Sequence, residues 1–248
     1  MDHYTRHPFK LPLSLAVALA CLVMPGPGRA QEGPSAQPPV VIELFSSQAC
    51  TYCPPADRYL GQLVQQQGII GLSCHVDYFD VKKGSLSKNF CTKRQTNYIN
   101  ALKVPAHYTP QMVVNGHYEV IGYEANKVSA AILKARSERM DLLQIVKAPD
   151  GSYNYNLPQK DLQGQEVHIW LAVFDKPHQK TIQEGGNRGK SVTYYNVVQS
   201  LTDIGKWNGA AQTRKVNPFL KAENAGFAVL IQNHKTGRII GSGAFYNK

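Results

Sequence analysis

Two cysteines separated by two residues, Cys50 and Cys53, are the residues of this chain best suited to chemistry. They follow a short apolar run, 40–45, and precede a stretch, 59–64, whose apolar residues recur at helical spacing. The N-terminus of a helix presents unpaired N–H groups and a partial positive charge, which stabilise a thiolate. We therefore predict that Cys50 is an exposed, attacking thiol and that Cys53 is a buried, resolving thiol.

A Cys-x-x-Cys pair can also form a zinc site or a plain structural disulfide. A structural zinc site needs a second pair of ligands at suitable spacing. The remaining candidates, Cys74 with His75 and Cys91, lie at irregular intervals. A structural disulfide between Cys50 and Cys53 is therefore the stronger of these two alternatives.

The first 30 residues have the composition of a secretory signal. Arg6 and Lys10 precede a nearly continuous apolar run, 11–24, and the small residues Gly28 and Ala30 follow it. We predict cleavage after Ala30 and a periplasmic or secreted protein. Because a membrane span needs about 20 apolar residues, we expect none after processing, although an uncleaved anchor is the alternative.

The net charge argues against one class of function. It is +10 at pH 7, but the basic residues are scattered, which indicates a solvated surface and argues against nucleic-acid binding.

The number of cysteines indicates disulfides. Four cysteines follow the signal, and an exported chain meets an oxidising environment. Of the three possible pairings, the local one leaves Cys74 with Cys91 as a structural disulfide candidate. No cofactor or resident metal is predicted.

The rest of the chain divides into a polar, proline-rich lead (31–39) and two regions. We predict an α/β domain over 40–144, in the order β-α-β-α-β-β-α, and an antiparallel β-rich module over 145–248. The expected strands are 40–45, 69–76, 109–115, 118–121, 166–175, 192–201, 226–232 and 238–245, and the expected helices start after Cys50 and cover 89–102 and 125–139.

Thr109 and Pro110 open the third expected strand, and a proline at the head of a strand can be cis. An ordinary trans proline is the alternative. The order of elements, with Cys-x-x-Cys after the first strand and Thr-Pro at the third, resembles thioredoxin. In that fold a cis proline faces the disulfide and the backbone before it pairs with substrate. By this resemblance, Thr109 and Pro110 would flank the Cys50 sulfur.

Within the thioredoxin superfamily the chain resembles a family of exported bacterial thioredoxin-like proteins of unassigned function. The resemblance implies the fold and export, and supplies no reaction. It rests on Glu43-Leu44-Phe45, Ser47-Gln48, Cys50-x-x-Cys53-Pro54-Pro55-Ala56-Asp57, Val76-Asp77-Tyr78, the segment 108–116 and Tyr194-x-Asn196-Val197-Val198.

Two acidic residues lie near the cysteines in sequence. Thioredoxins place a buried acid in the strand before the motif, where it accepts a proton from the resolving thiol, and Glu43 is our candidate. A shift of one residue in register would turn Glu43 to the other face of the sheet. Asp57 is expected to interact with the first turn of the helix or with the charge of Arg58.

The leading hypothesis is an exported thiol–disulfide oxidoreductase that acts on protein thiols or disulfides. The alternative is a non-catalytic binding module for a partner protein or a soft metal such as copper, with His107 near Cys50 and Cys53.

The glycine-rich segment 185–191 resembles a phosphate loop but has Glu184 where that motif needs glycine. We expect a mobile loop there. The oligomeric state is not predicted.

Overall fold

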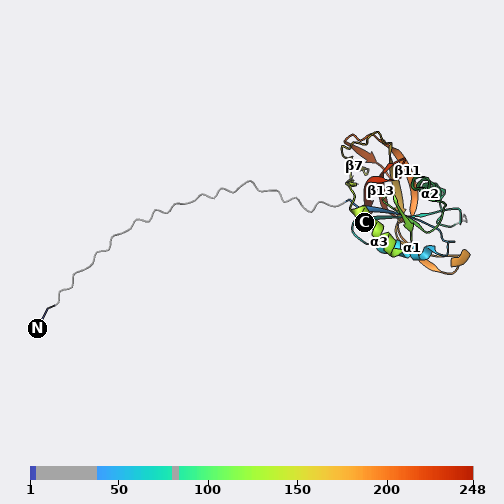
Figure 1. Cartoon of the computed structure of the whole chain (residues 1–248), viewed down its shortest axis with the longest axis horizontal. Coiled ribbons are helices and arrows are strands. Elements are labelled where there is room, and N and C mark those ends of the chain that lie inside the picture. Colours follow the sequence, from blue (N-terminus) through green and yellow to red (C-terminus); the bar gives the residue numbers. More distant parts are fainter. Residues whose placement is uncertain (4–37, 80–83, 248) are drawn as a thin grey trace. The chain divides into compact units, whose positions relative to one another are not determined.

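The computed structural model describes residues 1–3, 38–79 and 84–247. The predicted signal sequence, apart from residues 1–3, lies outside them, as does most of the lead. The predicted α/β fold is confirmed, and Figure 1 shows the α-helices α1, α2 and α3 in the first region. Its elements are β1 (Val40–Ser46), α1 (Cys53–Leu63), β2 (Ile69–His75), α2 (Asn89–Leu102), β3 (Gln111–Val114), β4 (Tyr118–Ile121) and α3 (Ala125–Arg136).

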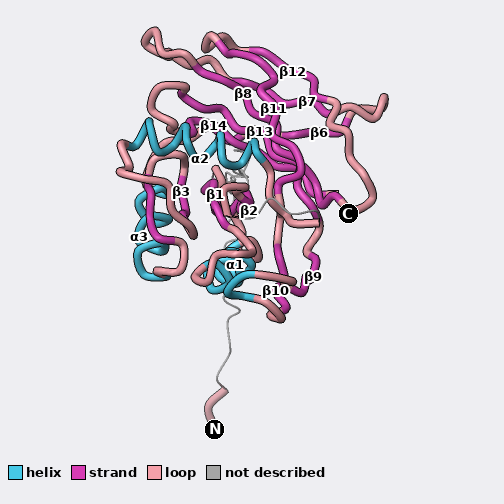
Figure 2. The backbone as a smooth tube through the Cα atoms, turned by 90° about the vertical axis from the view of Figure 1, so that its right-hand side faces the viewer, coloured by secondary structure: helices cyan, strands magenta, loops and turns pink. Residues whose placement is uncertain are grey.

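The thioredoxin-like sheet has the strand order β2-β1-β3-β4, with β1 parallel to β2 and antiparallel to β3. All seven residues of β1 are buried, because helices or strands cover both faces of the sheet. Successive side chains of β1 pack into two different hydrophobic cores. Ile42 and Leu44 pack with α1 and α3, whereas Val41 and Phe45 pack with α2 and the β-rich region. Figure 2 shows α2 between the two regions.

The second region is built mainly of strands, as predicted. Its elements are β5 (Asp141–Leu142), β6 (Ile145–Lys147), β7 (Tyr153–Leu157), β8 (Val167–Asp175), β9 (His178–Thr181), η1 (Gly185–Asn187), β10 (Ser191–Tyr194), β11 (Val198–Trp207), β12 (Gln212–Val216), β13 (Asn224–Asn233) and β14 (Ile239–Tyr246). A five-stranded sheet has the order β11-β8-β13-β14-β5, a three-stranded sheet has the order β12-β7-β6, and β10 and β9 form a hairpin. All of these strand pairs are antiparallel except β14 with β5.

The strand predicted over 192–201 is wrong, because the chain turns within it at Asn196. Asn196 has a positive φ of 48°, which ends β10 and starts β11. Its carbonyl accepts a hydrogen bond from Ser73 N at 3.0 Å, and its side-chain amide donates to Gly71 O at 2.9 Å. The second region thus covers the outer edge of β2, where backbone groups would otherwise lack partners.

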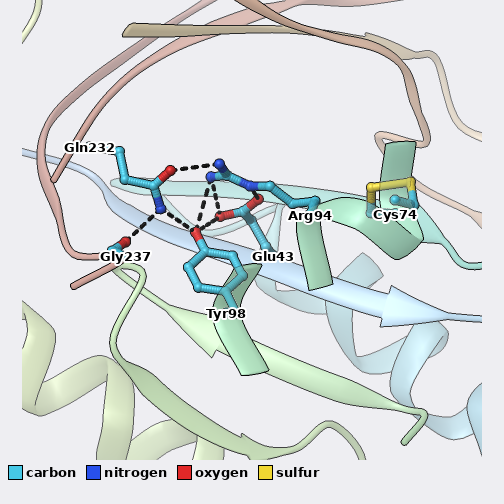
Figure 3. Close-up of polar contacts among 7 residues, drawn as sticks. Glu43, Cys74, Arg94, Tyr98, Gln232 and Gly237 are labelled. Atoms are coloured by element: carbon cyan, nitrogen blue, oxygen red, sulfur yellow. Dashed lines mark hydrogen bonds and ion pairs between the residues drawn. A yellow bond between two sulfur atoms is a disulfide. The ribbon is translucent and has the colours of Figure 1, made fainter. Parts of the chain in front are cut away.

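A buried polar cluster also joins the two regions (Figure 3). Glu43 on β1 accepts hydrogen bonds from Arg94 on α2, at 2.9 Å from Nε and 3.0 Å from Nη2. The hydroxyl of Tyr98 also donates to Glu43. Gln232 on β13 accepts from Arg94 Nη1 at 2.6 Å and donates to Gly237 O at 2.5 Å. Because Arg94 and Glu43 are almost fully buried, the charge of each side chain is stabilised by the opposite charge of the other.

A disulfide joins Cys74 on β2 to Cys91 on α2, as predicted. It ties the sheet to the helix that carries Arg94. Within the described residues, no helix combines the length and the apolar composition that a membrane crossing requires.

We expect Glu43→Gln to lower the free energy of unfolding by about 3 kcal/mol, because it leaves the buried charge of Arg94 without a counter-charge. Urea denaturation measures this change. The matched control is Glu124→Gln, which breaks a pair with the solvent-exposed Lys127 and should change stability little. Equal stability of the two variants would contradict the structural role of the Glu43–Arg94 pair.

Candidate functional site

The paired cysteines lie at the start of α1. Tyr52 precedes the helix, and Pro54 follows Cys53 in the first turn, where a missing N–H leaves no hydrogen bond unmade. Cys50 and Cys53 are both free thiols. Cys50 keeps 7% of its surface exposed and Cys53 none, so the expected order of outer and inner thiol is present, although Cys50 is more shielded than an exposed thiol would be.

The surroundings of Cys50 favour its thiolate. A hydrogen bond from the Cys53 thiol is the largest cause that lowers the pKa of Cys50, which falls to about 6 although burial opposes the change. Thr109 and the backbone N–H groups of Tyr52 and Cys53 act in the same direction. At neutral pH Cys50 is therefore mostly ionised, as a nucleophile requires.

The pKa of Cys53 is shifted in the opposite direction. Burial raises its pKa far above that of an ordinary thiol, and the neighbouring Cys50 and Asp57 add to the effect. Asp57 lies on α1, is buried, and accepts a hydrogen bond from Ser46 Oγ at 3.1 Å. Burial raises the pKa of Asp57 to about 7. This carboxyl can hold or release a proton near neutral pH.

The buried acid next to the resolving thiol is thus Asp57 and not Glu43. Glu43 points to the opposite face of β1, where it pairs with Arg94, because successive side chains of a strand alternate between faces. The sequence contained a signal for Asp57: it stands four residues after Cys53, and residues four apart share one face of a helix.

Thr109 and Pro110 lie against the motif as the resemblance implied. The peptide bond between them is cis, and Pro110 is buried. The Cys50 sulfur lies 3.5 Å from Thr109 O, to which it donates a hydrogen bond when the thiol is protonated. The structure thereby brings together four of the five predicted site residues, Cys50, Cys53, Thr109 and Pro110, and separates Glu43 from them.

The metal alternative gains no ligand set from the described residues. His107 forms a hydrogen bond with Thr96 Oγ1 at 2.8 Å. His75 is fully buried, and burial lowers its pKa to about 3, so its ring is neutral. No group of three or more His, Cys, Asp or Glu residues within the part of the chain described here is arranged to hold a metal ion.

Residues near the cysteines also come from the second region. The segment between β9 and β10 includes η1, and Asn187 at its end is fully buried. Its side-chain amide donates to Cys50 O at 2.6 Å and to Gln48 O at 3.1 Å. This contact could not be predicted from the sequence, because 137 residues separate Asn187 from Cys50.

Two tyrosines mark the outer surface beside the motif. Tyr52 is 66% exposed and Tyr123 44% exposed, and their ring centroids are 6.1 Å apart. Gly122, next to Tyr123, donates its N–H to Pro110 O at 2.9 Å.

Comparisons with known proteins identify a matching family and a similar solved structure. A family described as "Protein of unknown function (DUF1223)" matches residues 41–232. The crystal structure of protein AGR_C_4864 from Agrobacterium tumefaciens is similar, with a TM-score of 0.72 and 25% identity over 86% of this chain and 96% of that one.

Two further proteins are more distantly similar to this chain. A protein of Archaeoglobus fulgidus described as "Probable Thioredoxin" is 24% identical over 83 residues, which are 34% of this chain and 74% of that protein. HBP35 of Porphyromonas gingivalis has a TM-score of 0.60 at 15% identity, over 86% of this chain and 76% of that one. The chain therefore has a distant thioredoxin-like homologue.

We expect the stability of the reduced protein to fall as pH rises from about 4 to 7, and Asp57→Asn to abolish this fall. The pKa of Asp57 is about 7 in the folded protein against an ordinary 3.8, so between these values only the folded state holds the proton. The difference is on the order of 4 kcal/mol, since one pKa unit corresponds to 1.36 kcal/mol.

Urea denaturation of both proteins at pH 4 and pH 8 measures the effect. Any fixed cost of burying the asparagine amide cancels between the two pH values. A difference in stability between wild type and variant that is the same at both pH values would show that Asp57 has an ordinary pKa.

Proposed function

The chain belongs to the family described as "Protein of unknown function (DUF1223)", and from its paired thiols we propose that it is an exported thiol–disulfide oxidoreductase. The observation that carries the proposal is the contrast within the pair. Cys53 holds the pKa of Cys50 down to about 6 through a hydrogen bond, whereas burial raises the pKa of Cys53 itself. Such divergence beside a buried acid is typical of reactive sites.

The proposed reaction is exchange through a mixed disulfide. The Cys50 thiolate attacks one sulfur of a partner disulfide, a Cys50–partner bond forms, and the other partner sulfur leaves as a thiolate that takes a proton from water. Asp57 then accepts the proton of Cys53, whose sulfur attacks Cys50 and releases the second partner thiolate. The partner gains two electrons and the Cys50–Cys53 pair loses them, and the same steps in reverse oxidise a partner dithiol.

The surface beside Cys50 supports a protein partner. Tyr52 and Tyr123 are exposed, and Thr109 O lies 3.5 Å from the Cys50 sulfur. The backbone of an extended partner segment could align along the residue before Pro110, as the thioredoxin resemblance implies. The proposed partners are protein thiols or disulfides.

One observation favours the alternative of a binding module with a structural disulfide. Cys50 keeps only 7% of its surface exposed, so a partner must displace neighbours to reach its sulfur. In that case the function would not depend on the thiol, and a Cys50→Ser variant would retain it.

We expect Cys53→Ser to accumulate a mixed disulfide with oxidised glutathione, because Cys50 attacks and no resolving thiol remains. The rate of adduct formation should reach half its maximum above pH 6, because this variant lacks the thiol hydrogen bond that is the main cause of the low Cys50 pKa. Mass spectrometry of the adduct measures this. Cys50→Ser should form almost none, and the control Cys74→Ser/Cys91→Ser should exchange as wild type does. A Cys53→Ser protein that forms no more adduct than Cys50→Ser does would refute exchange.

Export is tested separately. We expect the full chain, when produced in a bacterium with a periplasm, to be recovered there with Gln31 as its first residue, because the small residues before it suit signal peptidase. Edman sequencing identifies that residue. Recovery of the intact chain with Met1 from the cytoplasm would contradict export.

A further inference from the structure

The segment that joins β9 to β10 lies directly on the cysteine motif. A Cβ atom on Gly186 would lie 2.5 Å from Thr51 Oγ1, and one on Gly185, whose φ is +73°, would lie 3.3 Å from Ala49 Cα. The positive φ favours glycine at Gly185, and the short distance at Gly186 shows how closely its backbone approaches the Thr51 side chain. The loop therefore packs against the residues before and between the cysteines.

Asn187 is the residue through which this loop binds the motif. Its side chain is fully buried, and its amide nitrogen donates to Cys50 O at 2.6 Å and to Gln48 O at 3.1 Å. Lys190 Nζ donates to Asn187 Oδ1 at 3.0 Å, which fixes the amide with its N–H groups toward the motif. Both donors of the amide are thus used on backbone carbonyls next to the reactive sulfur.

The loop is itself held in place by the hairpin. Ile182 N donates to Lys190 O at 2.9 Å, and Gly189 N donates to Ile182 O at 2.8 Å. From the other side, Gln48 Oε1 accepts a hydrogen bond from Leu86 N at 3.0 Å. The residues before Cys50 are thereby fixed from two directions.

We propose that Asn187 is a positioning residue for Cys50, supplied by the β-rich region, which holds the 48–50 backbone so that the sulfur faces the N–H groups of Tyr52 and Cys53. The proposal rests on the proposed thiol chemistry and adds a residue outside the thioredoxin-like sheet to it. Without the amide, the carbonyls of Gln48 and Cys50 lose a buried donor. The backbone then shifts, and the sulfur moves away from the donors that stabilise its thiolate.

The test is the pH dependence of Cys50 alkylation by iodoacetamide in the reduced protein, with the Cys74–Cys91 disulfide intact. We expect Asn187→Ala to raise the pH of half-maximal rate by about one unit, which slows the reaction at pH 5.5 several-fold, because fewer donors reach the thiolate. The matched control is Gln183→Ala, which removes an exposed amide from the same loop and should leave the profile unchanged.

A folded Asn187→Ala protein with the wild-type profile would overturn the proposal. If that variant does not fold, Asn187→Val takes its place, because valine fills more of the buried space than alanine and carries no donor for Cys50 O or Gln48 O. Its profile should shift upward in the same way. An unshifted Asn187→Val profile would overturn the proposal equally.

The wild-type profile separates this inference from the proposed function. A wild-type midpoint near that of a free thiol, about 8.5, would count against thiol chemistry at Cys50 as a whole. A wild-type midpoint near 6 that Asn187→Ala leaves in place would refute only the role of Asn187.

Discussion

The constraint on which this structure depends is that β1 is buried on both faces. Each of its side chains must fit the surroundings on its own face of the sheet, and alternate residues pack into different cores. On one face Leu44 packs under α1, and Ser46 at the strand end donates to Asp57. On the other face Glu43 meets Arg94. A single strand thereby separates the buried acid near the thiols from the acid that joins the two regions.

The β-rich region completes the thioredoxin-like region at three separate places. Asn196 occupies the edge of β2, Gln232 closes the polar cluster around Arg94, and Asn187 binds the backbone at Cys50. Hydrophobic residues of both regions also form one continuous cluster around Phe45 and Phe174. The second region therefore contributes to the stability of the first and to the geometry of its thiols, which a separate appendage would not do.

Features determined by neighbouring residues could be predicted from the sequence. The cysteine pair, the turn after Val114 and the helix 89–102 depend on local spacing, and the Cys74–Cys91 disulfide followed from counting. Features determined by register or by distant contacts could not. One residue of register decides whether Glu43 or its neighbour faces α1, the positive φ of Asn196 has no periodic signature, and Asn187 meets Cys50 only after the whole β-rich region has folded.

The proposed function requires the Cys50–Cys53 pair to exchange disulfides, and the reduction potential of the pair shows whether it can. The protein would be equilibrated against glutathione buffers, with Cys74→Ser/Cys91→Ser used to isolate the pair. We expect a potential above about −250 mV, in the range of exchange catalysts. A potential below about −300 mV would identify a structural bridge and contradict the proposed function.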